Sequence, residues 1–302
     1  MIRPPALKFN DKAVILSPAG NIAETTVNGA AAILREWGLQ VGVSPNALSH
    51  TGRFSGFVEQ RLSDLQHAMD DPDVKLILCS RGGYGVVHLL DKLKFEGIRE
   101  NPKWVIGYSD ITALHAALQH NWILSLHGPM AKHFADEGAA DVAVRYTKAI
   151  LAGQSVKYEI PVTEYGYLNR QGQASGRLFG GNLSVYCGIL GSKYAKTPRK
   201  GILFIEDIGE EPYKVDRYIH QLKLAGVFDK ISGLIVGQFN DYTEDNDMYN
   251  ALFESILAAV SEYTFPVCFG FPVGHVKHNF PLIMGARATL SVKENSIVFK
   301  QR

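Results

Sequence analysis

Short apolar segments alternate with helical patterns through the first 150 residues of this 302-residue chain. The clearest apolar segments are 14–16, 74–79 and 104–106, and each runs into a turn containing glycine, serine or proline. Strand–helix alternation with short turns is typical of a parallel sheet that helices cover on both faces. We therefore predict an α/β fold, in which ligands gather at the C-terminal ends of the strands.

The pattern also predicts how the chain is organised. Residues 1–150 are expected to form an N-terminal parallel-sheet α/β domain, with helices at 24–37, 56–70, 84–93 and 111–120. A polar, turn-rich stretch at 151–172 is interpreted as a linker. Residues 173–302 are expected to form a smaller, β-rich C-terminal α/β domain. It contains apolar runs at 201–205, 233–237 and 266–269 and ends in a hairpin at 287–299.

Composition excludes several classes of function. Hydrophobic residues make up 46% of the chain, which is enough for a substantial core and argues against global disorder. The net charge of +1 argues against nucleic-acid or membrane-surface binding. No apolar run approaches the roughly 20 residues that a membrane span needs, and the N-terminus lacks the pattern of a signal peptide. The three widely spaced cysteines, Cys79, Cys187 and Cys268, fit buried thiols in a reducing compartment. A cytoplasmic location is expected.

One strand–turn–helix stretch carries a candidate reactive residue. The apolar run 104–106 stops at Gly107, and apolar residues at helical spacing begin directly after Asp110. Ser109 is therefore expected on a sharp turn before a helix, where α/β hydrolases place a serine nucleophile. Its alternative role is an ordinary helix N-cap.

A serine nucleophile needs a base and a group that orients the base. Among ten histidines, His275 stands out because it follows an apolar strand in the Gly- and Pro-rich loop 270–275. Glu206 and Asp207 end the predicted strand 202–205, and local chemistry does not choose between them. A loop histidine without a role and a surface turn are the corresponding alternatives.

Backbone donors for a developing negative charge are available at two neighbouring strand ends. Gly82 and Gly83 expose N–H groups without side-chain obstruction, and the N–H of Asp110 follows the candidate nucleophile. A phosphate-binding loop is less favoured here, because the spacing of the known glycine-rich phosphate motifs is absent. No metal-ligand spacing occurs, and a zinc pair of His127 and His133 is disfavoured.

Five ordered motifs together resemble the LD-carboxypeptidases, the serine peptidases of family S66. They are Arg81-Gly82-Gly83-Tyr84-Gly85, residues 107–114 around Gly-Tyr-Ser-Asp, His127-Gly128-Pro129-Met130, Gly180-Gly181-Asn182-Leu183 and Gly274-His275. The resemblance implies a triad of Ser109, Glu206 and His275, and so selects Glu206 over Asp207. It also implies oxyanion donors at Gly83 and Asp110, in a two-domain fold with the active site at the domain interface.

The resemblance implies a function as well. The muropeptide members release the terminal D-alanine of murein tetrapeptides during peptidoglycan recycling, and the RGGYG form looks more like that branch. Arg81, Gly82 and Tyr84 are the expected substrate-binding residues, with Arg81 a candidate for the terminal carboxylate or, alternatively, a structural arginine. No cofactor or metal is expected, and the family suggests a homodimer. The run 280–285 is more apolar than the usual family pattern, which is expected to alter a pocket wall.

Two alternatives remain open from the sequence. The related microcin-immunity peptidases hydrolyse an amide that joins an acidic residue to a nucleotide analogue. A two-domain protein that binds a small ligand without chemistry would keep the same sheet.

Overall fold

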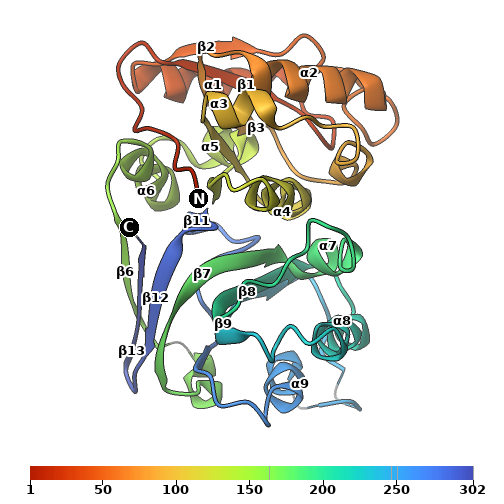
Figure 1. Cartoon of the computed structure of the whole chain (residues 1–302), viewed down its shortest axis with the longest axis vertical. Helices are drawn as coiled ribbons and strands as arrows, with labels where there is room; N and C mark the ends of the chain where they lie inside the picture. Colours follow the sequence, from red (N-terminus) through yellow and green to blue (C-terminus); the bar gives the residue numbers. More distant parts are fainter. Residues whose placement is uncertain (163, 246, 250, 302) are drawn as a thin grey trace. The chain divides into compact units, whose positions relative to one another are not determined.

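The computed structural model describes residues 1–302 apart from residues 163, 246, 250 and 302. Contacts divide the chain into two compact units (Figure 1). The first unit comprises Met1–Gln154 and the returning segment Lys277–Gly285, and the second comprises Ser155–Val276 and the residues from Ala286 onward. The chain thus crosses between the units more often than the predicted succession of domain, linker and domain.

The first unit is built on a six-stranded sheet in the order β11-β5-β4-β3-β1-β2. Its strands are β1 (Lys12–Leu16), β2 (Gln40–Val43), β3 (Val74–Cys79), β4 (Trp104–Gly107), β5 (Ser125–His127) and β11 (Leu282–Met284). All pairs are parallel except β11 with β5. The residues of β3 and β4 are almost all buried, as expected for a parallel sheet covered on both faces.

The antiparallel strand β11 explains the apolar run noted at 280–285. Leu282, Ile283 and Met284 are fully buried, and they pair with the strand Ser125–His127. An apolar composition is what a buried strand requires. This contribution from a segment more than 150 residues further along the chain gives the first sheet its sixth strand.

The helices of the first unit include three of the four that were predicted, those at 24–37, 56–70 and 111–120. They are α1 (Glu24–Glu36), α2 (Val58–Asp70), η1 (Val86–His88), α3 (Glu96–Glu100), η2 (Ser109–Ile111), α4 (Thr112–His120), α5 (Ala131–Glu137) and α6 (Val142–Leu151). The predicted helix at 84–93 is wrong, because only the single 3-10 turn η1 forms there. Gly85, with φ of +127°, breaks the helical path before Val86.

The second unit contains a seven-stranded mixed sheet in the order β10-β9-β8-β7-β12-β13-β6. Its strands are β6 (Val156–Pro161), β7 (Gly172–Asn182), β8 (Gly201–Ile208), β9 (Ile231–Asn240), β10 (Val267–Cys268), β12 (Arg287–Val292) and β13 (Ser296–Gln301). Strands β7 to β10 pair in parallel, whereas β12, β13 and β6 form an antiparallel extension. The predicted hairpin is present as β12 and β13, and β6 lies within the stretch interpreted as a linker.

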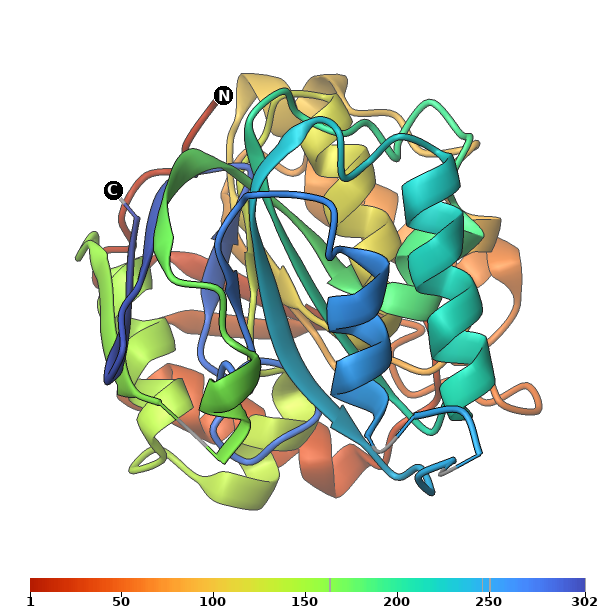
Figure 2. The same cartoon turned by 90° about the horizontal axis from the view of Figure 1, so that it is seen from below.

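Helices cover the parallel part of this second sheet. They are η3 (Glu164–Leu168), α7 (Leu183–Gly188), α8 (Pro212–Leu224) and α9 (Leu252–Ala259). Figure 2 shows α8 and α9 side by side over the strands, and α8 also contacts α7. Their apolar faces pack with β8 and β9 into one buried cluster, which includes Leu203, Ile219, Leu234 and Ile256.

Two further expectations concern the whole chain. All three cysteines are free and buried, as predicted for structural thiols. In the part of the chain that the structure describes, no helix combines the length and apolar character of a membrane span.

Candidate active site

Ser109 occupies a strained turn between β4 and α4. Its φ of +63° lies in the left-handed region, which is uncommon for residues other than glycine and is often found at functional sites. The turn is tight because Gly107 lies against Ile111, where a Cβ on the glycine would approach Cγ1 to 2.7 Å. This strand–turn–helix geometry matches the turn that presents a serine nucleophile.

The alternative role of Ser109 as a helix N-cap is wrong. The N-cap of the 3-10 turn η2 is Tyr108, and that of helix α4 is Ile111. Neither helix start has a side-chain capping hydrogen bond. The strain at Ser109 therefore does not serve a helix cap.

The loop after β3 lies directly against this serine. A Cβ added to Gly82 would come within 2.7 Å of Ser109 Cβ and 2.8 Å of Ser109 Oγ, so only glycine fits there. Gly83 follows with φ of +120°, a conformation that also favours glycine. The N–H of Gly20 donates to the carbonyl of Gly82 at 3.1 Å, which ties the loop to the end of β1.

Two buried side chains hold the far end of the same loop. Arg61 on α2 is 2% exposed, and its Nη1 donates to the carbonyls of Pro18 at 2.8 Å and Gly85 at 2.9 Å. The Asp110 carboxylate accepts the N–H of Val86 at 2.9 Å. Burial raises the pKa of Asp110 to about 6, against the opposing effects of the Val86 N–H and the Arg61 charge. The sequence pattern did not single out Arg61.

A buried histidine fixes the strand end before the serine. His115 on α4 is 1% exposed, and its Nε2 lies 2.8 Å from the carbonyl of Gly107. Because a carbonyl only accepts, Nε2 carries the proton, and Nδ1 then accepts from the Ser125 hydroxyl at 2.8 Å. Burial lowers the pKa of His115 to about 4, so the ring is neutral at physiological pH. This histidine therefore has a packing role.

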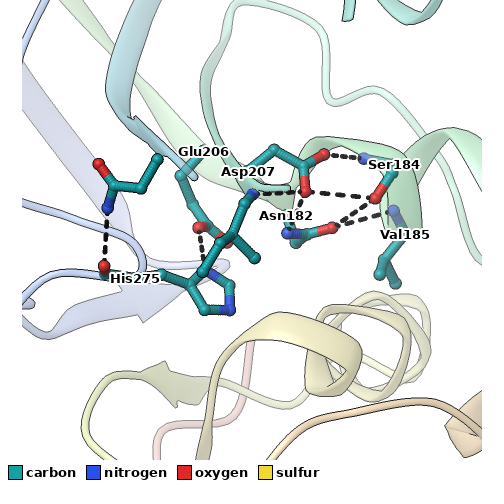
Figure 3. A network of polar contacts seen from close by, with 8 residues as sticks. Asn182, Ser184, Val185, Glu206, Asp207 and His275 are labelled. Atoms are coloured by element: carbon teal, nitrogen blue, oxygen red, sulfur yellow. Dashed lines mark hydrogen bonds and ion pairs between the residues drawn. The ribbon is translucent and has the colours of Figure 1, made fainter. Parts of the chain in front are cut away.

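The second unit holds a hydrogen-bonded pair of a carboxylate and a histidine (Figure 3). His275 Nδ1 lies 2.8 Å from Oε2 of Glu206, whose side chain is fully buried at the end of β8. Gly274 makes this approach possible, since a Cβ there would lie 2.8 Å from Glu206 Oε2. Asn240 Nδ2 donates to the carbonyl of His275 at 2.7 Å and so holds the loop backbone.

The surroundings of His275 favour its charged form. Burial alone lowers the pKa of His275, but the hydrogen bond and charge of Glu206 outweigh it, with smaller contributions from Asp207 and Asp241. The net effect is a pKa of His275 above its ordinary value. A carboxylate in this position is suited to stabilise an imidazolium that forms during proton transfer.

Glu206 and Asp207 have different partners because successive strand side chains point to opposite faces. Asp207 accepts from Asn182 Nδ2 at 2.8 Å and from the N–H of Ser184 at 2.8 Å, at the start of α7 (Figure 3). Burial and the neighbouring Glu206 charge raise the pKa of Asp207 to about 6. The register of β8 with β9 shifts between Ile205 and Asp207, and such irregularities often occur beside active sites.

Comparison with known proteins agrees with these motifs. The model of the LD-carboxypeptidase N-terminal domain matches residues 14–128, and that of the C-terminal domain matches residues 175–290. A relative from Bacillus subtilis, described as a probable murein peptide carboxypeptidase, is 33% identical over 311 residues, covering 99% of this chain and 94% of the relative. The chain belongs to the LD-carboxypeptidase family.

Two further relatives of this LD-carboxypeptidase bear on its fold and specificity. The crystal structure of muramoyltetrapeptide carboxypeptidase from Oxalobacter formigenes has a TM-score of 0.87 and 27% identity, covering 96% of this chain and 98% of that one. The microcin C7 self-immunity protein of Escherichia coli is 27% identical over 271 residues, covering 80% of this chain and 78% of that protein. The fold is thus the two-part α/β fold of this family, as predicted.

The residues predicted for this LD-carboxypeptidase fall into two groups. Ser109 lies with the Gly82–Gly83 loop and Asp110 in the first unit, whereas Glu206 and His275 form a bonded pair in the second. Among the described residues, no three histidine, cysteine, aspartate or glutamate side chains are grouped as metal ligands would be.

Proposed function

We propose that this LD-carboxypeptidase hydrolyses the amide bond between an L-centre and the C-terminal D-alanine of murein tetrapeptides. Ser109 is the nucleophile, His275 the general base and Glu206 the group that orients His275. The N–H groups of Gly83 and Asp110 stabilise the oxyanion. Family membership and the names of the relatives support this substrate class.

The 2.8 Å hydrogen bond between Glu206 and His275 is the observation that carries the proposal. It fixes the imidazole so that Nδ1–H faces the carboxylate, and the basic nitrogen of the neutral ring is then Nε2. The strained Ser109 is the residue for which such a base is needed. The chain passes from the second unit to the first at Val276–Lys277, directly after His275.

In the first half of the reaction, Ser109 Oγ attacks the scissile carbonyl carbon while its proton moves to His275 Nε2. The carbonyl oxygen becomes negative and receives hydrogen bonds from the N–H groups of Gly83 and Asp110, each of which contributes roughly 3–4 kcal/mol to the transition state. The C–N bond then breaks, and His275 returns the proton to the departing D-alanine amine. A serine ester of the shortened peptide remains.

In the second half, a water molecule attacks the ester carbon and gives its proton to His275. The same two N–H groups stabilise the second oxyanion. The bond to Ser109 Oγ breaks, the proton returns to Oγ, and the tripeptide acid leaves. Because no step uses a metal or cofactor, release of D-alanine is expected to continue in the presence of a chelator.

The proposed substrate-binding residues belong to the loop after β3, residues 81–85, called here the glycine loop. Gly82 keeps the space above Ser109 free of a side chain. Tyr84 is 46% exposed and lies edge-on to His88 at a ring distance of 5.2 Å, so its ring is available to a peptide. Arg81 supplies a positive charge for the terminal carboxylate.

The function is tested with purified protein and a synthetic murein tetrapeptide. The wild type is expected to release D-alanine, and Ser109→Ala to lose at least about a thousandfold in kcat. Ser63→Ala, at an exposed position on α2, is the matched control and keeps full activity. Full activity in Ser109→Ala would show that Ser109 is not the nucleophile.

Labelling separates an enzyme from a ligand-binding protein. A fluorophosphonate probe is expected to modify the wild type at Ser109 and to leave Ser109→Ala unmodified. If the protein only binds a ligand without chemistry, the probe would modify neither the wild type nor Ser109→Ala.

Hydrolysis of an aminoacyl-nucleotide amide is the second candidate function, because the microcin C7 self-immunity protein is a relative. Side-by-side assays with a murein tetrapeptide and an aspartyl sulfamoyl adenosine decide between the two.

We also propose that the enzyme is a cytoplasmic homodimer. Cell fractionation tests the location, and light scattering on the purified protein tests the dimer.

A further inference from the structure

A pocket of about 390 Å³ opens beside the glycine loop in the first unit. Its lining contains two arginines and no acidic residue, and consists of Gly20, Asn21, Arg53, Arg81, Gly83 and Tyr84. In the described part of the chain, neither arginine takes part in a salt bridge. The two guanidinium groups therefore give the pocket an uncompensated positive charge.

Backbone contacts position Arg53 at the edge of this pocket. Thr51 and Phe54 exchange hydrogen bonds of 3.0 and 3.1 Å across a tight turn, in which Gly52 has φ of +59°. Asn21 ties this turn to the end of β1, since its N–H donates to the Arg53 carbonyl at 3.3 Å and its Nδ2 to the Gly52 carbonyl at 2.9 Å. The Arg53 backbone is thus anchored, although its side chain is exposed.

The same asparagine also positions the second arginine. Arg81 Nη1 donates to the carbonyl of Asn21 at 3.3 Å. Gly20 leaves room for the guanidinium, because a Cβ there would lie 3.3 Å from Arg81 Nε. One short segment, Gly20–Asn21, therefore holds both arginines at the rim of one cavity, and arginine pairs of this kind suit a carboxylate.

The place of the pocket suggests which carboxylate it takes. Gly83 both lines the pocket and supplies a proposed oxyanion donor. In a peptide, the C-terminal carboxylate lies one residue beyond the scissile carbonyl, a span of about 3.5 Å. When the scissile carbonyl oxygen of a peptide substrate faces the Gly83 N–H, the terminal carboxylate of that peptide is thus within reach of a pocket that begins at Gly83.

We propose that this pocket binds the free α-carboxylate of the C-terminal residue of the substrate, and that Arg53, together with Arg81, is its recognition residue. The inference rests on the proposed carboxypeptidase function and adds Arg53 to it. It explains how the enzyme selects a chain terminus, since an internal peptide bond brings no negative charge to the pocket.

The test compares two substrates, a murein tetrapeptide with a free C-terminal D-alanine and the same peptide ending in D-alaninamide. The wild type is expected to prefer the free acid by at least about a hundredfold in kcat/KM. Arg53→Gln is expected to raise KM for the free acid at least tenfold and to leave the rate with the amide unchanged, so that the preference shrinks. Arg53→Lys keeps the charge but not the paired donors, and is expected to recover part of the preference.

Arg99→Gln, at an exposed position on α3, is the matched control and keeps the preference of the wild type. A wild-type acid-to-amide ratio in Arg53→Gln, with D-alanine still released, would overturn the assignment of the pocket alone. Failure of the wild type to release D-alanine from the free acid and D-alaninamide from the amide would instead overturn the proposed function, and this inference with it.

Discussion

The contact between Gly82 and Ser109 makes Gly82→Ala the most direct probe of the proposed site. The new Cβ would lie 2.7 Å from Ser109 Cβ, whereas ordinary contacts begin at 3.4 Å. Something must therefore move by about 0.7 Å, the difference between these distances. The glycine loop is tied to Pro18 and Gly85 through Arg61, so the movement falls on the nucleophile or on the neighbouring oxyanion donor.

Displacements of this size have large effects on catalysis. A misplacement of about 1 Å costs roughly a hundredfold in rate, and loss of one oxyanion donor costs about 10²–10³ in kcat. We expect Gly82→Ala to lower kcat for D-alanine release by about a hundredfold, with KM within about threefold of the wild type.

The control for this substitution is Gly42→Ala on β2. Its Cβ would have Ala13 O at 4.0 Å as its nearest neighbour, so the same chemical change creates no clash. It is expected to keep full activity. A kcat of Gly82→Ala within threefold of the wild type, at unchanged thermal stability, would refute the placement of the glycine loop over Ser109.

Three further substitutions test other parts of the site. Glu206→Gln removes the charge of the residue that contributes most to raising the pKa of His275. The acidic limb of the pH profile of kcat/KM should therefore move to lower pH, while the maximal rate falls by up to about 10⁴-fold; an unmoved limb would contradict the pairing. Ser109→Gly should be more stable than Ser109→Ala by about 1 kcal/mol in urea unfolding, because alanine at φ of +63° is strained. Equal stabilities of the two variants would argue against the strained turn. Arg61→Met leaves the buried Asp110 carboxylate without its neighbouring cation and should lower the free energy of unfolding by about 3 kcal/mol. The double variant with Asp110→Asn should recover part of this loss. A loss below about 1 kcal/mol in Arg61→Met would contradict this account.

Some segments of the fold could be predicted and others could not. The difference is whether the local sequence pattern or contacts with distant residues determine the structure of the segment. The buried strands β3 and β4 carry continuous apolar runs, which identify them without tertiary information. The region 84–93 has apolar residues at helical spacing but does not form the helix. Gly85 adopts a positive φ there, and the Asp110 carboxylate captures the N–H of Val86. Apolar spacing alone does not register the glycine, and Asp110 lies outside the region.

The return of the chain to the first unit was beyond local prediction as well. Strand β11 has only three residues and pairs with β5 across more than 150 residues of sequence. A run this short is equally compatible with a buried turn or a helix segment. Its apolar character was visible, but its partner was not.

At the candidate site, the local pattern pointed to candidate reactive residues but not to the residues that support them. The turn around Ser109 and the Gly274–His275 loop have glycine signals that the structure explains by positive φ and close approach. Arg61 gave no signal, because a single arginine in a helical pattern looks like an ordinary surface residue. Its burial follows only from the carbonyls of Pro18 and Gly85 that face it.

The same arrangement, a buried aspartate that accepts a backbone N–H, follows both Ser109 and Glu206 of the proposed triad. Ser109 and Glu206 are each followed by a buried aspartate, and each aspartate accepts a backbone N–H at the start of a helical turn, Asp110 from Val86 and Asp207 from Ser184. The pKa of both aspartates is raised to about 6, chiefly by burial. A folded pKa above the unfolded one means that these groups stabilise the fold most in acid and that this stabilisation is lost as the pH rises through about 6. Near neutral pH, the two carboxylates therefore lower the stability of the fold, and their role is to hold the backbone around the reactive side chains in place.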